Sequence, residues 1–159
     1  MRNAIKKFGL VSVLVLSACG GSNSGGADLK KFVGTWRATS GTTTTACPGY
    51  AASTDPVTTN AVWSLGVSSD LVQADSGGTC PLMADVTGST ASGIPGQACT
   101  GFDSAGDALT QTFSGYTFVI SPDGHTATEN ASGNITVVGS GATVVCTFNE
   151  TASYEKIGN

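Results

Sequence analysis

Hydrophobic residues occur in two patterns along this chain. Residues 10–16 form one short, mainly apolar run, LVSVLVL, which is shorter than the roughly 20 residues needed to span a membrane. Beyond residue 32 the apolar positions instead alternate with Thr, Ser and Gly. Alternation with a period of two predicts half-buried β-strands, and Ala27–Phe32 before them is predicted to form one helical turn. The expected strands are 33–40, 57–67, 70–75, 80–87, 97–102, 109–121, 125–138 and 142–154.

The strongest alternation lies within residues 109–121. Tyr116, Phe118 and Ile120 share one face at a period of two, and Phe113 and Val119 are expected on the other. A turn signal, Ser-Pro-Asp-Gly at residues 121–124, follows directly. This segment is therefore predicted to be a strand that turns back into its neighbour.

Short turns between successive strands, without a long helical pattern, predict an all-β antiparallel up-and-down meander. Closing seven or eight strands into a barrel would remove the exposed edges, and a β-sandwich is the alternative. The threonine run Thr42–Thr45 and the segment Ala51–Thr54 are expected in a polar loop between the first two strands. Gly133 is a candidate bulge or bend.

The amino-terminal segment has the features of a secretory signal peptide. Arg2, Lys6 and Lys7 precede the apolar run, and small residues follow it at Ser17-Ala18. The next residues are Cys19 and a glycine- and serine-rich stretch, GGSNSGG, with the composition of a flexible linker. We therefore expect a signal peptide at 1–18, a tether at 19–27 and a β-domain at 28–159.

The stretch Leu16-Ser17-Ala18-Cys19 resembles the lipobox of bacterial lipoproteins. The resemblance implies cleavage before Cys19 and lipidation of that cysteine, including acylation such as palmitate. Two or three acyl chains give stable membrane anchoring. Because Gly20 is not the aspartate that favours inner-membrane retention in Gram-negative members, the resemblance implies a lipid-anchored protein of the cell envelope, at the outer membrane in a Gram-negative source.

Four further cysteines remain, namely Cys47, Cys80, Cys99 and Cys146. An even number in an exported chain favours disulfides, and four cysteines allow three pairings. Cys80 and Cys99 lie symmetrically about a turn signal at residues 88–90, which would leave Cys47 for Cys146, but the spacing does not settle the pairing. A zinc site needs closer ligand pairs, so no metal is expected.

Residues 32–36 read Phe-Val-Gly-Thr-Trp. This segment resembles the Gly-x-Trp signature of the lipocalins and the similar opening of fatty-acid-binding proteins. The resemblance implies that Gly34 and Trp36 are structural residues at the closed floor of a barrel. An arginine covers this tryptophan in lipocalins, and Lys156 is the only base near the end of this chain.

Charge and missing motifs narrow the function. From Cys19 onward four bases face eleven acids, and phosphate binding needs clustered Lys and Arg, so no nucleic-acid partner is expected. The single histidine, His125, follows a tight turn and is expected in solvent, and no nucleophile–base motif accompanies it. We therefore expect neither catalytic residues nor a cofactor.

Together these features predict a membrane-anchored lipoprotein whose barrel binds a small apolar ligand without catalysis. Arg37 is the only arginine after Cys19, so an interior arginine site for a fatty-acid carboxylate is not expected. The alternative is an envelope structural or protein-interaction lipoprotein with a packed, ligand-free core. Oligomeric state is left open.

Overall fold

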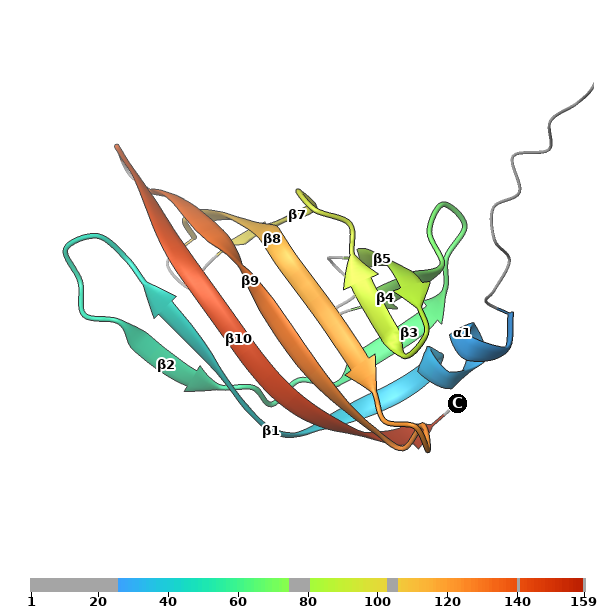
Figure 1. Cartoon of the computed structure of the whole chain (residues 1–159). Helices are drawn as coiled ribbons and strands as arrows, with labels where there is room; N and C mark the ends of the chain where they lie inside the picture. Colours follow the sequence, from blue (N-terminus) through green and yellow to red (C-terminus); the bar gives the residue numbers. More distant parts are fainter. Residues whose placement is uncertain (1–25, 75–80, 103–105, 140, 159) are drawn as a thin grey trace, which may run out of the picture.

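A computed structural model describes residues 26–74, 81–102, 106–139 and 141–158 of the chain. One short helix precedes ten antiparallel strands in this part of the protein (Figure 1). The elements are α1 (Gly26–Phe32), β1 (Gly34–Ala46), β2 (Ser53–Pro56), β3 (Ala61–Leu65), β4 (Leu71–Ala74), β5 (Leu82–Thr87), β6 (Thr90–Gly93), β7 (Ala98–Phe102), β8 (Ala108–Ile120), β9 (Thr126–Gly139) and β10 (Ala142–Gly158).

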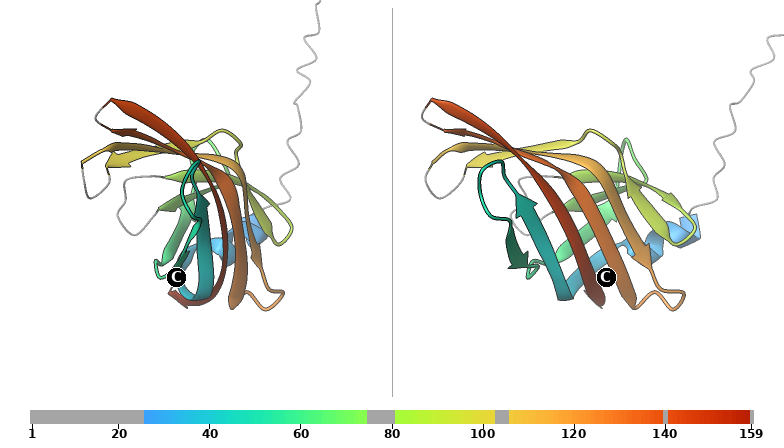
Figure 2. Two further views of the ribbon diagram at one scale, coloured as in Figure 1. Left: turned by 90° about the vertical axis from the view of Figure 1, so that its left-hand side faces the viewer. Right: turned by 60° about the vertical axis from the view of Figure 1, so that its left-hand side comes forward.

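The strands form a single sheet that closes on itself. Each ring strand pairs antiparallel with its neighbours in the order β10-β9-β8-β6-β5-β4-β3-β1, and β1 pairs in turn with β10. Strands β2 and β7 lie outside this ring of eight, paired to the far parts of β1 and β8. The predicted all-β antiparallel meander with a barrel-like form is thus confirmed, but the barrel is irregular because four long strands extend beyond the short ones (Figure 2).

The polar loop expected at Thr42–Thr45 is wrong, because these residues continue β1. Thr42 to Thr45 pair with β10 on one side and with β2 on the other. Threonine is β-branched and favours extended backbone, and the partner strand β10 is long enough to receive it. The apparent loop is therefore a β1–β2 hairpin that widens the wall of the ring.

A bulge in β8 changes which residues face the interior. The register of β8 with β9 shifts between Phe113 and Gly115, so strict alternation fails at this point. Tyr116, Phe118 and Ile120 are buried as predicted, but Phe113 joins the same face and packs against Tyr116 with ring centroids 6.4 Å apart. The predicted outward position of Phe113 is therefore wrong. The bulge expected at Gly133 is also absent, since β9 pairs with β10 through Gly133 without a register shift.

Close approach explains the glycine at position 133. A Cβ there would lie 2.0 Å from the Thr112 carbonyl oxygen and 2.8 Å from the Phe148 ring. Only a residue without a side chain lets β8 and β9 approach this closely beneath a large aromatic ring. The bulge lies on the neighbouring strand β8, between Phe113 and Gly115.

Aromatic side chains fill the end of the ring where β1 begins. Trp36 is fully buried and contacts Phe118 at 5.3 Å between ring centroids. Its indole Nε1 donates a hydrogen bond to the Phe32 carbonyl at the end of α1, 2.8 Å away. Lys156 Nζ lies 5.6 Å from the centroid of the Trp36 ring and donates a hydrogen bond to the Lys31 carbonyl. The helix, the tryptophan and the cation on it together cover this end.

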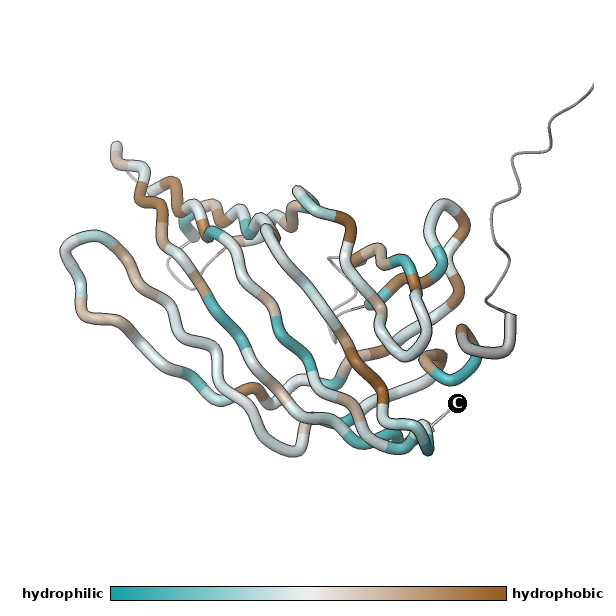
Figure 3. Tube along the Cα trace, viewed as in Figure 1, coloured by the Kyte–Doolittle hydropathy of each residue, from teal (hydrophilic) through white to brown (hydrophobic). Residues whose placement is uncertain are grey.

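Hydropathy follows this arrangement along β8. The apolar stretch at its carboxyl end lies beside the aromatic floor, whereas the long strands carry mixed polar and apolar positions over most of their length (Figure 3). A disulfide joins the two strands that close the ring, because Cys47 follows β1 directly and bonds to Cys146 of β10. Cysteine chemistry thus locks the β1–β10 seam at the end opposite the floor.

Candidate functional site

A cavity of about 370 Å³ lies inside the ring, above the aromatic floor. This volume lies in the range of about 300–1,000 Å³ typical of small-molecule sites. Thr59, Asn60 and Thr100 at its border are exposed, so the cavity reaches solvent there. Its lining residues are Thr59, Asn60, Ala61, Gln73, Leu82, Cys99, Thr100, Gly101, Leu109, Gln111, Phe113, Tyr116, Glu129, Ala131, Ile135, Phe148, Glu150 and Tyr154.

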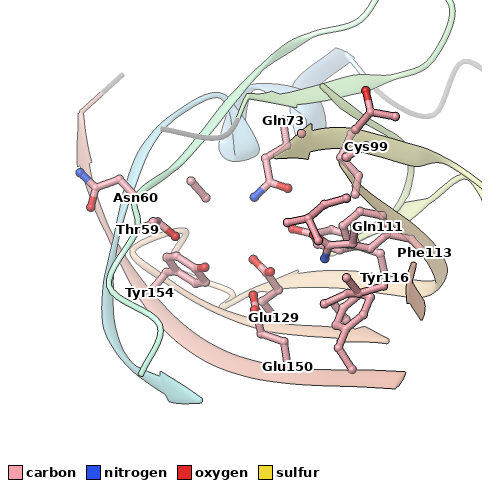
Figure 4. A pocket seen from close by; sticks show the side chains of 18 residues that line it. Thr59, Asn60, Gln73, Cys99, Gln111, Phe113, Tyr116, Glu129, Glu150 and Tyr154 are labelled. Carbon is pink, nitrogen blue, oxygen red and sulfur yellow. The ribbon is translucent and has the colours of Figure 1, made fainter. Parts of the chain in front are cut away.

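Two carboxyl groups point into this space from neighbouring strands. Glu129 lies on β9 opposite Ala152, and Glu150 lies on β10 opposite Ala131. The two glutamates are therefore diagonal neighbours on the same face of the sheet. Figure 4 shows their carboxyl groups side by side, aimed into the cavity.

Hydroxyl groups surround the pair on the same wall. Tyr116 reaches it from β8 and Tyr154 from β10, and both line the cavity. Thr43 of β1 donates a hydrogen bond from Oγ1 to Oε2 of Glu150. This bond restrains one carboxyl group and leaves the other, Glu129, facing the open space.

The electrostatics of this wall are dominated by burial. Glu129 is 5% exposed, and burial together with the neighbouring Glu150 carboxylate raises its pKa to about 8. The tyrosine hydroxyls oppose this shift by interacting with the ionised form. Burial and the negative charge of Glu129 in turn raise the pKa values of Tyr116 and Tyr154. At neutral pH Glu129 is thus mostly protonated.

Two polar atoms of this wall lack a hydrogen-bond partner within the described part of the chain. They are Oη of Tyr116 and Oε2 of Glu129, and each residue is only 5% exposed. The hydroxyls of Tyr116 and Tyr154 favour the ionised form of Glu129 by hydrogen bonding to it, but the distances and angles give Oε2 of Glu129 no partner among the described residues. Leaving a buried polar group unsatisfied costs about 1–3 kcal/mol, so the wall carries unused hydrogen-bonding capacity.

The remaining walls are largely aromatic and aliphatic. Phe113 packs edge-on against Phe148 with ring centroids 5.6 Å apart, and Leu82 and Ile135 also face the cavity. Gln73 adds an amide side chain across the cavity from the glutamates, and Gln111 adds a second one near Phe113 (Figure 4). The cavity therefore combines an apolar body with one acidic wall.

A second hollow, of about 400 Å³, lies near the β8–β9 turn. Thr39, Thr126 and Thr128 on its border are exposed, and neither of the two unpaired atoms described above belongs to it. Residues at the end of β8 and the start of β9 form much of its lining, so this hollow lies at the end of the strands and not inside the ring. The cavity inside the ring is therefore the candidate site.

The residues predicted from sequence lie mostly around the site rather than in it. Gly34 and Trp36 belong to the floor, and a Cβ at Gly34 would meet the Gly158 carbonyl oxygen at 2.1 Å. Cys99 lines the cavity and is disulfide-bonded. Cys19 and Cys80 lie outside the described residues.

Glu129 and Glu150 were not among the site residues predicted from the sequence. Each sits at an inward position of an alternating strand, between Ala127 and Ala131 or between Phe148 and Ala152. A charged residue at an inward position of an otherwise apolar stripe was the available signal. His125, by contrast, is exposed beside the β8–β9 turn, away from the cavity lining.

Neither a membrane-spanning helix nor a metal-binding cluster of side chains occurs in the part of the chain that the structure describes. No helix there is long and apolar enough to cross a bilayer. No group of three or more His, Cys, Asp or Glu side chains is placed to hold a metal ion within the same residues.

No protein-family model and no curated protein sequence matches the chain. Among solved structures, the S-type phycobiliprotein lyase CPES from Guillardia theta is similar, at a TM-score of 0.36 and 11% sequence identity. The similarity covers 82% of this chain and 91% of that one. A likeness this distant assigns neither a family nor a function.

Proposed function

We propose that this protein is a non-enzymatic, lipocalin-like module that binds one small molecule with a mainly apolar body inside its ring. The observation that carries the proposal is the cavity of about 370 Å³ with aromatic and aliphatic walls. Sites of this kind bury most of a small ligand against apolar side chains and orient it with a few polar groups. The same cavity disfavours an envelope protein with a packed, ligand-free core.

The proposal includes the membrane anchor implied by the lipobox-like residues. Lipid on Cys19 would hold the β-domain at a membrane of the cell envelope, with residues 20–27 as the tether. Metabolic labelling with an alkyne analogue of palmitate in a bacterial host tests this part. The chain should take up label and Cys19→Ser should not, whereas an unlabelled wild-type chain would refute the anchor.

Ligand binding is tested with N-phenyl-1-naphthylamine, a neutral fluorescent probe with an apolar body. The purified full-length chain should bind it saturably at one site per chain. Ala131→Phe places a ring in the cavity, since Ala131 is buried on its lining. Asn130→Phe, on the outer face of the same strand, is the matched control.

We expect Ala131→Phe to abolish saturable binding and Asn130→Phe to retain it, with both variants folded by circular dichroism. Absence of saturable binding to the wild-type chain would refute the proposal. Equal binding to both folded variants would place the probe outside the cavity and refute it as well.

A further inference from the structure

The acidic wall of the cavity narrows the class of ligand. Within the described lining there are two carboxyl groups and no Lys, Arg or His side chain. Buried acidic side chains are rarely left without a basic partner. The cavity therefore offers its occupant acidic oxygens that have no basic side chain beside them in the described lining.

Two unpaired oxygen atoms on this wall indicate a ligand that donates hydrogen bonds. Oε2 of Glu129 lacks a partner within the described residues although its residue is 5% exposed, and it belongs to a side chain aimed into the cavity (Figure 4). Oη of Tyr116 is buried and unpaired on the same wall. Both oxygens can accept a hydrogen bond, so a ligand that donates several N–H groups would satisfy them.

Aromatic rings beside the carboxyl pair suit an organic cation. Phe113 and Phe148 present aromatic surface next to the carboxyl pair, and aromatic rings attract ammonium groups through their π faces. Ionised hydrogen bonds between an ammonium group and a carboxylate are about twice as strong as neutral ones. The chain as a whole has a formal net charge of −4, which attracts cations over longer distances.

We propose that the ligand is an organic amine, held by its ammonium group between Glu129 and Glu150 with its apolar body against Phe113 and Phe148. This inference rests on the proposed function and specifies the ligand class for the same cavity. Thr43 fixes Glu150 through its hydrogen bond, so Glu129 is the carboxyl group that meets the ammonium group most freely. The Tyr116 hydroxyl accepts a further N–H.

Three compounds with the same ring system test the inference at pH 7. They are 1-naphthylmethylamine, which is cationic, 1-naphthalenemethanol, which is neutral, and 1-naphthoic acid, which is anionic. Calorimetric titration of the full-length chain should give an affinity for the amine about tenfold or more above that for the alcohol. The acid should bind most weakly.

Substitutions then test whether Glu129 causes the higher affinity for the amine than for the alcohol. Glu129→Gln should reduce the amine-to-alcohol affinity ratio severalfold, because the amide keeps the shape but cannot ionise and leaves Glu150 as the one carboxyl partner of the ammonium group. Asp85→Asn removes an exposed carboxyl group on the outside of β5 and should keep the ratio of the wild-type chain. A folded Glu129→Gln variant with an undiminished ratio would overturn the role of Glu129.

Proton release provides a second readout. Glu129 is mostly protonated at pH 7, so an incoming ammonium group should expel close to one proton, seen as a buffer-dependent binding enthalpy. The titratable groups that face Glu129 are Tyr116 from β8 and Glu150 and Tyr154 from β10. Neither tyrosine ionises at this pH, because both pKa values are raised.

The outcomes separate this inference from the proposed function. Equal binding of the amine and the alcohol, or tightest binding of the acid, would overturn the amine inference while the cavity still binds a small molecule. No binding of these compounds or of N-phenyl-1-naphthylamine would overturn both. Amine binding without proton release would refute the contact with Glu129.

Discussion

Replacing Glu129 by glutamine should make the protein more stable at pH 8 and leave its stability at pH 5 nearly unchanged. Glutamine has almost the shape of protonated glutamate and never ionises. In the folded protein burial and the Glu150 carboxylate raise the pKa of Glu129 from 4.5 to about 8. The wild-type chain therefore keeps this carboxyl group neutral when folded and ionises it when unfolded.

The sign and size follow from this difference. Between pH 4.5 and 8 the folded state binds one proton more than the unfolded state at this site, so stability falls as pH rises. The slope is about 1.4 kcal/mol per pH unit, and the full difference corresponds to roughly 5 kcal/mol. Small domains have a total stability of only about 5–15 kcal/mol, so the effect is large enough to measure.

Urea unfolding at pH 5, 6, 7 and 8 under oxidising conditions provides the assay. Fluorescence of the buried Trp36 and Trp63 reports unfolding. The wild-type free energy of unfolding should fall with pH more steeply than that of Glu129→Gln, and exposed Asp85→Asn serves as the control. Parallel pH dependences for the wild type and Glu129→Gln would refute a neutral, buried carboxyl group in the cavity.

Two further substitutions test what stabilises the pairing of β1 with β10. Replacing Cys47 and Cys146 together by serine removes a disulfide between residues 99 positions apart. The free energy of unfolding should fall by about 2–5 kcal/mol. An unchanged urea midpoint would contradict a stabilising role of this disulfide. Gly34→Ala places a Cβ 2.1 Å from the Gly158 carbonyl oxygen at a backbone φ of +131° and should cost about 1–3 kcal/mol. Thermal unfolding compares it with Gly49→Ala, where the added Cβ meets nothing within 4 Å and the positive φ contributes alone, so equal losses would contradict the close approach.

Local patterns in the sequence carried most of the fold. The alternation around Tyr116 and Phe118 predicted a strand with one buried face, and the structure confirms that face. The antiparallel meander followed from short turns between such strands. These features depend on neighbouring residues only, because the strand period and the turn geometry are properties of the local backbone.

Features that depend on register needed the tertiary structure. The bulge between Phe113 and Gly115 turned Phe113 inward, and nothing in the alternation marks the residue at which a strand slips. The threonines of β1 look like a loop until β10 and β2 are placed on either side of them. Register is set by the partner strand, which the local sequence does not contain.

The chain by itself thus determined a β-rich meander, the aromatic strand of its core and the residues that resemble a lipobox and a Gly-x-Trp opening. Only the tertiary structure brought Glu129 and Glu150 together, 21 positions apart in sequence, on one wall of a cavity. The alternation marks each glutamate as an inward charge on its own strand, but it does not show that the two meet. Closure of the ring between β1 and β10 places both on one inner face. Burial of Glu129 there raises its pKa and leaves its Oε2 without a partner among the described residues.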